Sequence, residues 1–225
     1  MRVAIMQPTF LPWFGYFHLM ASVDVFVFLD DVEISMQSWQ TRNYFLKSGA
    51  PGWISVPVNT SSSGLIRDVS IQNPERFISK LLKTLAQSYA KAPCVGQVSP
   101  LVEVLENMQT HLLGEFNIRC IEVIAKTLDI GTVAVKSSDL GLTGQKSAHV
   151  VEILDALGAE SYTSTVGSRD YMEEFGLHRF GRQVVFHGYD GCQLFSGHHQ
   201  HGVNMSVWHS LVNHSLEDLR HGLSA

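Results

Sequence analysis

Short apolar runs recur along the chain, and their spacing predicts alternating strands and helices. We expect a buried strand over residues 3–6, a loop over 7–12, a helix over 15–22 and a second apolar strand over 24–29. The prolines at 8 and 12 keep the loop out of a helix. Two strands that are apolar throughout, joined by a helix, are typical of a βαβ unit in a parallel sheet with both faces covered.

The rest of the pattern extends this alternation. Residues 53–58 are a third strand candidate, which Pro57 places at an edge or a strand end. Asn73-Pro74-Glu75 has the sequence of a helix start. We expect one α/β domain over residues 1–225 with a mostly parallel sheet, a helical C-terminal part and a helical segment at about 75–128 that could form a subdomain. The other predicted elements are helices over 75–90, 99–115, 116–128, 147–157 and 206–213, and strands over 132–135, 161–163 and 183–186.

Composition narrows the function classes. The chain has 225 residues, 45% of them hydrophobic and 16% charged, so it can bury a sizeable core. Acidic residues outnumber Lys and Arg by 21 to 16, which argues against a nucleic-acid partner. No apolar run approaches the roughly 20 residues of a membrane span, so we expect no membrane insertion.

Location and assembly are constrained less strongly. The first ten residues lack a signal-peptide pattern, and three widely spaced cysteines form no disulfide framework, so a cytoplasmic location is expected. Four Trp and twelve Phe residues could supply a homodimer interface, but the sequence does not define the oligomeric state. It identifies no cofactor.

Polar residues follow the first two predicted strands. Gln7 and Pro8 come after the first, and Asp30 and Asp31 after the second. Ligands of open parallel sheets bind beyond the carboxyl ends of the strands, so these loops are candidates for one site. Paired acids can bind a metal, or act as a base when desolvation raises one pKa. The alternative is that the aspartates only end a strand and solvate a loop.

A second candidate segment contains Trp39, Arg42 and Asn43. The Arg guanidinium offers a fixed fork for carboxylate or phosphate, Asn can orient a polar ligand, and Trp can stack on one. An ordinary amphipathic loop would have the same composition.

Two further loops resemble anion sites. Gly144, Lys146 and Ser147 precede a predicted helix whose N-terminus, capped by Ser147, would attract an anion, although a helix cap alone explains them. The glycine spacing there is not that of a Walker loop. Ser164 begins a second such loop after another strand, with a simple turn as the alternative.

A histidine cluster near the C-terminus could bind zinc. Its members are His198, His199 and His201. Adjacent histidines point apart and no HExxH pattern occurs, so a solvated loop is favoured and no metal site is predicted.

Several segments together resemble the WbqC-like protein family. Gln7-Pro8, Pro12, Gly15-Tyr16-Phe17, Asp30-Asp31-Val32, Trp39 and Arg42-Asn43 match its opening, QPxFxPxxGYF, then DDV, then W-x-N-R-N. Tyr89-Ala-Lys-Ala-Pro93, Gly144-Gln-Lys146, Tyr162-Thr-Ser164 and Ser206–Asn213 follow in family order. The chain departs from the family pattern with His18 for Gln, Thr41 for Asn and His209 for Asp.

The resemblance implies a biosynthetic transferase, because the family is associated with gene clusters for bacterial surface polysaccharides and other products. The small-molecule substrate would be a nucleotide-linked amino sugar or a similar amine that receives an acyl or aminoacyl group. In this hypothesis Arg42 and the helix start at 144–147 bind an anionic group. Asp30 or Asp31 deprotonates or orients the amine, His18 is an acid or base, and Gln7 and Asn43 position the substrate. Tyr16 is a further substrate-binding residue in this hypothesis.

A more distant resemblance gives a second hypothesis. Residues 3–10 with Gly15, Tyr16, His18 and Leu19 are similar to the first strand, loop and helix of HIGH-motif nucleotidyltransferases and pantothenate synthetase. This implies a nucleotidyltransferase/HUP-like core and a nucleotide-dependent ligase. The two phosphate-binding histidines of that motif correspond to Trp13 and Tyr16 here, which cannot carry the charge. A non-catalytic ligand-binding protein is the third hypothesis.

Overall fold

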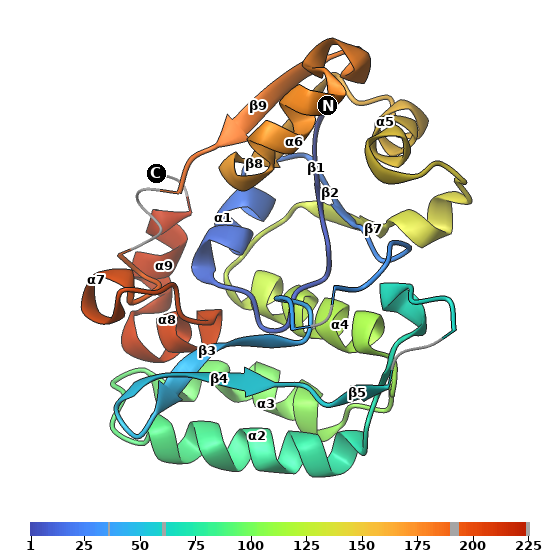
Figure 1. Cartoon of the computed structure of the whole chain (residues 1–225). Helices are drawn as coiled ribbons and strands as arrows, with labels where there is room; N and C mark the ends of the chain where they lie inside the picture. Colours follow the sequence, from blue (N-terminus) through green and yellow to red (C-terminus); the bar gives the residue numbers. More distant parts are fainter. Residues whose placement is uncertain (36, 60–61, 190–193, 224–225) are drawn as a thin grey trace.

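The computed structural model describes residues 1–35, 37–59, 62–189 and 194–223, and its centre is a sheet of five parallel strands (Figure 1). The strands lie in the order β7-β2-β1-β8-β9, which becomes 3-2-1-4-5 when they are numbered by appearance within the sheet. That order is shared with the first five strands of doubly wound dinucleotide-binding folds. The predicted α/β class, a mostly parallel sheet flanked by helices, is confirmed. The strands are β1 (Arg2–Met6), β2 (Val25–Phe28), β7 (Val133–Lys136), β8 (Ser161–Thr165) and β9 (Gln183–His187).

Both faces of the sheet are covered, which explains strands that are apolar throughout. Because side chains alternate along a strand, Ala4 of β1 lies in one apolar cluster while Val3 and Ile5 lie in another. The first cluster includes residues of α1 (Phe14–Ala21) and α4 (Leu113–Thr127), and the second includes residues of α5 (Lys146–Ala156) and α6 (Arg169–Phe175).

The connection from β2 to β7 contains much of the chain. It forms a separate antiparallel hairpin of β3 (Arg42–Lys47) and β4 (Ala50–Ser55), followed by α2 (Pro74–Ser88), α3 (Ser99–Glu106) and α4. Figure 1 shows α2 running alongside this hairpin, on the side away from the central sheet. The remaining elements are β5 (Val58–Asn59), β6 (Ser70–Ile71), α7 (His198–His201), α8 (Val207–Asn213), α9 (Leu216–Gly222), and the 3-10 turns η1 (Ile66–Asp68), η2 (Val95–Val98), η3 (Ser137–Leu140), η4 (Val166–Ser168) and η5 (Leu177–Phe180).

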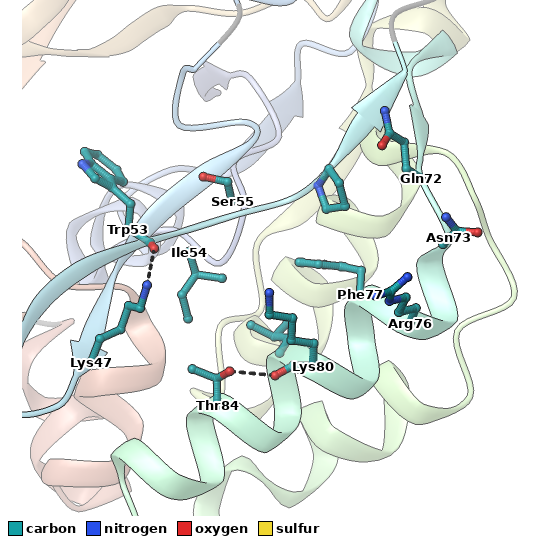
Figure 2. A pocket seen from close by; sticks show the side chains of 12 residues that line it. Lys47, Trp53, Ile54, Ser55, Gln72, Asn73, Arg76, Phe77, Lys80 and Thr84 are labelled. Atoms are coloured by element: carbon teal, nitrogen blue, oxygen red, sulfur yellow. Dashed lines mark hydrogen bonds between the residues drawn. The ribbon is translucent and has the colours of Figure 1, made fainter.

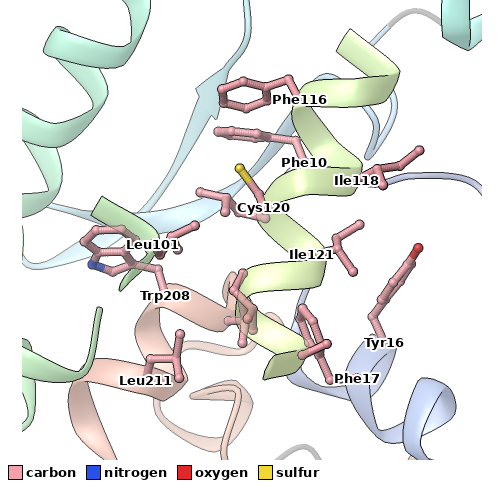
Figure 3. Packing of buried hydrophobic residues seen from close by; sticks show 14 of the residues in the cluster. Phe10, Tyr16, Phe17, Leu101, Phe116, Ile118, Cys120, Ile121, Trp208 and Leu211 are labelled. Atoms are coloured by element: carbon pink, nitrogen blue, oxygen red, sulfur yellow. The ribbon is translucent and has the colours of Figure 1, made fainter. Parts of the chain in front are cut away.

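Helix α4 lies at the centre of the larger apolar cluster. Phe116 of α4 stacks on Phe10 at a centroid distance of 6.3 Å, and Trp208 and Leu211 of α8 pack near the same helix (Figure 3). The cluster extends without interruption from β1 to α2 and α3. The helical segment therefore shares its core with the sheet.

The predicted helices over 99–115 and 116–128 are wrong where they join. Helix α3 ends at Glu106, and the intervening residues pair with the β6 region: the N–H of Ile71 donates to the carbonyl of His111, and that of Leu113 to Val69. These main-chain bonds satisfy groups that a continuous helix would have paired internally. Residues 53–58 also divide into β4 and β5 around Pro57, which has no N–H for a ladder.

Cys94 and Cys120 are free thiols, and Cys192 lies outside the described residues. Within the described part of the chain, no helix combines the length and the apolarity that a membrane crossing requires.

Candidate functional site

A cavity of about 750 Å³ lies where β1 and β8 leave the sheet. The strand order reverses between these two neighbours, and ligands of open parallel sheets bind at such a point. The cavity is lined by Ile5, Met6, Gln7, Thr9, Pro12, Trp13, Tyr16, Leu29, Trp39, Gln40, Asn43, Tyr44, Thr165, Gly167, Tyr189, His198, Val203 and Asn204.

The cavity wall combines aromatic rings with uncharged polar groups. No Asp, Glu, Lys or Arg is among the described residues that line it, while His198 contributes an imidazole. Aromatic faces stack on planar rings and on the apolar faces of sugars, and side-chain amides can both donate to and accept from hydroxyl groups. The wall therefore suits a neutral, hydroxyl-bearing or planar part of a ligand better than an isolated anion.

Asn43 of β3 fixes the loop that follows β1. Its Nδ2 donates to the carbonyls of Phe10 (3.1 Å) and Leu11 (2.8 Å), and its Oδ1 accepts the N–H of Tyr44 at 2.8 Å. Leu11 has a φ of +39°, a conformation that costs free energy for a residue with a side chain. The amide of Asn43 therefore holds a strained turn in place, in addition to lining the cavity.

Two more buried side chains bind carbonyls of the same loop. Nδ2 of Asn117, on α4, donates to the carbonyls of Pro8 and Gln40, both at 3.0 Å. The Tyr16 hydroxyl donates to the carbonyl of Gln7 at 3.2 Å, and burial raises the pKa of Tyr16 well above its ordinary value. The Gln7 side chain accepts from the amide of Gln40. The loop is thus held from three elements before any ligand arrives.

Trp13 forms part of the cavity wall, and Gly15 makes room for it. A Cβ at Gly15 would lie 2.3 Å from the nearest atom of the Trp13 ring. Trp13 packs edge-on against Tyr189 at 5.0 Å, and Tyr189 against His187 at 5.1 Å. Behind this wall Nδ1 of His18 lies 2.6 Å from Nε2 of His187, whose pKa is lowered to about 4 by burial and by His18. The structure therefore places His18 behind the cavity wall.

The two aspartates share one hydrogen-bond partner, the Ser137 hydroxyl, but their other contacts differ. Asp30 accepts the N–H (3.0 Å) and the hydroxyl (2.8 Å) of Ser138 and lines a separate cavity of about 660 Å³. Asp31 accepts the hydroxyl of Ser137 and lies 3.1 Å from Nε2 of His149 on α5. Neither carboxylate lines the β1–β8 cavity, so the expected convergence of both with Gln7 on one pocket does not occur.

Arg42 also points elsewhere. Its guanidinium lies over the ring of Trp53, with Cζ 4.3 Å from the centroid, and does not line the cavity. Its Nε is buried with no hydrogen-bond partner in the described structure. Trp39, by contrast, lines the cavity and is half exposed.

The segment at 144–147 does not form the expected capped helix start. Helix α5 begins at Lys146, and no side chain caps it. Ser147 is already inside the helix, with a buried hydroxyl that has no partner within the described residues. The Gly144 N–H donates to Glu152 at 2.8 Å, and Lys146 is exposed. These residues lie outside the β1–β8 cavity.

The end of β8 at Thr165 and the η4 turn at Gly167 do reach the cavity. Ser164 itself is buried beside it, and its hydroxyl bonds to those of Ser168 (2.7 Å) and Tyr162 (3.3 Å). Of the predicted binding residues, Gln7, Tyr16, Trp39 and Asn43 therefore line one cavity, while Pro8 and Ser164 support its walls.

Sequence reasoning missed several lining and supporting residues. Tyr189 and Asn204 are far from Gln7 along the chain, and no local pattern marks them. Asn117 did carry a signal, because an amide between apolar neighbours in a buried helix needs hydrogen-bond partners. His198 belongs to the short helix α7, whereas a loop was expected. Among the described residues, no three His, Cys, Asp or Glu side chains are grouped to bind a metal.

The fold and the cavity define an α/β protein with a cavity at the switch point of a parallel sheet. The profile of the WbqC-like protein family matches residues 7–221, so the chain belongs to that family, as its motifs indicated. It is 28% identical over 204 residues to the uncharacterized protein Rv1507c of Mycobacterium tuberculosis, with 87% of each chain covered. No solved structure is significantly similar to the chain.

Proposed function

We propose that the protein is a biosynthetic transferase whose cavity between β1 and β8 binds a nucleotide-linked amino sugar or a similar small molecule. The amine would receive an acyl or aminoacyl group from an activated donor. The observation that supports this best is the uncharged wall of aromatic rings and amides, at the position where this sheet order places ligands. Such a wall can recognise a sugar or a nucleoside through stacking and through hydrogen bonds to hydroxyl groups.

The reaction requires a group that accepts the proton of the attacking amine. As the amine nitrogen bonds to the acyl carbon, the bond from that carbon to the donor's leaving group breaks and the nitrogen loses a proton. Tyr16 is unsuitable because its hydroxyl already donates to Gln7 and its pKa is raised. His198 reaches the cavity and has the imidazole that such steps use, so we assign the proton acceptor to it.

A binding experiment tests the site. Isothermal titration with uridine-diphosphate-linked amino sugars should show saturable binding, and Trp39→Ala should weaken it about tenfold through lost stacking. Val95→Ala is the control, since Val95 is an exposed apolar residue outside the cavity. The proposal fails if amino-sugar nucleotides do not bind, or if both variants bind them like the parent chain.

A turnover experiment tests the chemistry. Mass spectrometry of the bound amino-sugar nucleotide, incubated with acyl-coenzyme A or an aminoacyl donor, should detect the added group. His198→Gln should reduce the rate by about 100-fold and leave binding nearly unchanged. Binding without any transfer would instead favour a non-catalytic ligand-binding protein.

A nucleotide-dependent ligase or nucleotidyltransferase is the second candidate. The 3-2-1-4-5 strand order favours it, because nucleotides bind at the switch point of such sheets. Against it, the two positions of the HIGH-like histidines are occupied by Trp13, which packs edge-on against Tyr189, and by the buried Tyr16. Saturable binding of ATP with magnesium in the cavity, abolished by a substitution at Thr165 or Gly167, would favour this candidate over acyl transfer.

A further inference from the structure

A second feature lies on the far side of the β3–β4 hairpin from the cavity. A groove of about 480 Å³ runs between β4 and one side of α2 (Figure 2). Its floor is apolar and includes Ile54 and Phe77, and its rim includes Lys47, Arg76 and Lys80. No acidic side chain lines the groove among the described residues.

The open edge of β4 can be derived from the contacts of β3. In the described structure β4 pairs only with β3, and Leu46 opposes Pro51 while Tyr44 opposes Trp53. The N–H of Leu46 donates to the Tyr89 hydroxyl at 3.0 Å, so it points away from β4. In an antiparallel pair, two directly opposed residues direct their N–H and C=O groups either both toward each other or both away from each other. Pro51 and Trp53 therefore also turn their main-chain groups outward.

By the same alternation Ser55 faces outward as well. The N–H and C=O groups of Trp53 and Ser55 are thus available along this edge, apart from a long contact of 3.4 Å from Lys47 Nζ to the Trp53 carbonyl. Pro51 lacks an N–H, and both proline and lysine are common guards of exposed edges. The first residues of the β4 edge are therefore protected against pairing with another strand, whereas the main-chain groups of Trp53 and Ser55 can pair.

The charges along the groove suit an extended chain. Arg76 and Lys80 are both exposed and one helical turn apart, about 6 Å along the axis of α2. Alternate side chains of a strand are spaced by about 6.6 Å, so acids at positions i and i+2 of an added strand match this pair. Within the described residues, neither cation has a carboxylate partner.

We propose that this groove binds an extended acidic segment of another protein, which adds a third strand at Trp53 and Ser55 and directs two alternate carboxylates to Arg76 and Lys80. Main-chain hydrogen bonds provide affinity in such strand addition, and side-chain contacts provide specificity. A small anion would contact the two cations but would leave the N–H and C=O groups of the β4 edge unpaired. The proposal is independent of the transferase function, because the groove shares no lining residue with the β1–β8 cavity.

Synthetic peptides test this directly. A fluorescent peptide of five residues, with Glu at its second and fourth positions and Val elsewhere, should bind the full chain. The same peptide with Gln in place of Glu should bind about tenfold more weakly, and so should one N-methylated where its N–H faces β4. Titration followed by amide NMR should shift the signals of Trp53 and Ser55.

Variants separate this groove from general charge effects. Arg76→Glu combined with Lys80→Glu should abolish binding of the acidic peptide. Lys83→Glu combined with Lys91→Glu makes the same change in net charge at exposed positions outside the groove, and should leave binding within twofold. The proposal is overturned if the acidic peptide does not bind below about 1 mM, or if the N-methylated peptide binds equally well. It is also overturned if inorganic phosphate shifts the amide signals of Trp53 and Ser55 but does not compete with the peptide, because the peptide would then bind outside the groove.

Discussion

Removing the Asn117 side chain should destabilise the protein severely, because this residue is fully buried and donates hydrogen bonds to two main-chain carbonyls. Asn117→Ala leaves the carbonyls of Pro8 and Gln40 without this donor. A buried polar group that loses its partner costs about 1–3 kcal/mol, and the space left by the amide adds to that. We expect a loss of about 3–5 kcal/mol, or roughly 10 °C in Tm for a chain of this size.

Urea unfolding at neutral pH, followed by circular dichroism, measures this loss as a shift in midpoint at constant slope. Asn107→Ala is a matched control: Asn107 also donates Nδ2 to one carbonyl, that of Glu103 at 2.8 Å, but is exposed, so its loss should cost less than about 1 kcal/mol. Asn117→Leu restores volume without the donor and should remain as unstable as Asn117→Ala. The reasoning is refuted if Asn117→Ala costs no more than the control, or if Leu restores stability.

Three further predictions follow from individual contacts. Gly15→Ala places a Cβ against the ring of Trp13, so it should change tryptophan fluorescence and cost about 1–3 kcal/mol; an unchanged spectrum and midpoint would contradict the packing described. Asp31→Ala removes the carboxylate beside the buried His149 and one of the two acceptors of Ser137, and should cost about 2–4 kcal/mol, whereas Asp24→Ala at an exposed ion pair should cost much less; equal losses in urea would contradict this. Burial as the main cause, and neighbouring histidines as the second, lower the pKa of His209 from 6.5 to about 4. As pH drops, His209 is therefore protonated in the unfolded chain before it is protonated in the folded chain, and the stability falls between about pH 6.5 and about pH 4. His209→Asn should reduce that fall, and parallel pH–stability curves for the two proteins would contradict it.

Much of the central fold could be predicted because local patterns encode it. The apolar runs at 3–6 and 24–29 locate β1 and β2 within about a residue of their observed bounds, and the helix expected over 147–157 is α5. The break at residues 107–112 could not be predicted locally. It depends on main-chain bonds to the β6 region, some 40 residues earlier along the chain. Strand β3 also escaped prediction, because it combines charged and apolar residues in a way that a loop can share, whereas the strand expected over 53–58 overlaps β4.

The candidate site was predictable only in part, for two different reasons. Gln7 was found because it follows the first strand, Trp39 and Asn43 because of their side-chain chemistry, and Tyr16 through the family motif. Tyr189 comes from beyond β9 and depends on the whole sheet order. The contacts of Asp30 and Asp31 could not be predicted locally, because both carboxylates bind Ser137, which lies far along the chain at the start of η3.

In the proposed site, the contacts separate the residues that hold the loop after β1 from those that face the cavity. Tyr16 and Asn43, which belong to the family motifs, donate hydrogen bonds to main-chain carbonyls of the loop after β1. Trp39, Tyr189 and His198 instead face the cavity from segments outside that loop. A substitution at Tyr16 or Asn43 should therefore lower stability and binding of every ligand together. A substitution at Trp39 should instead change which ligand binds while the unfolding midpoint stays nearly constant, and this difference distinguishes the framework of the site from its recognition surface.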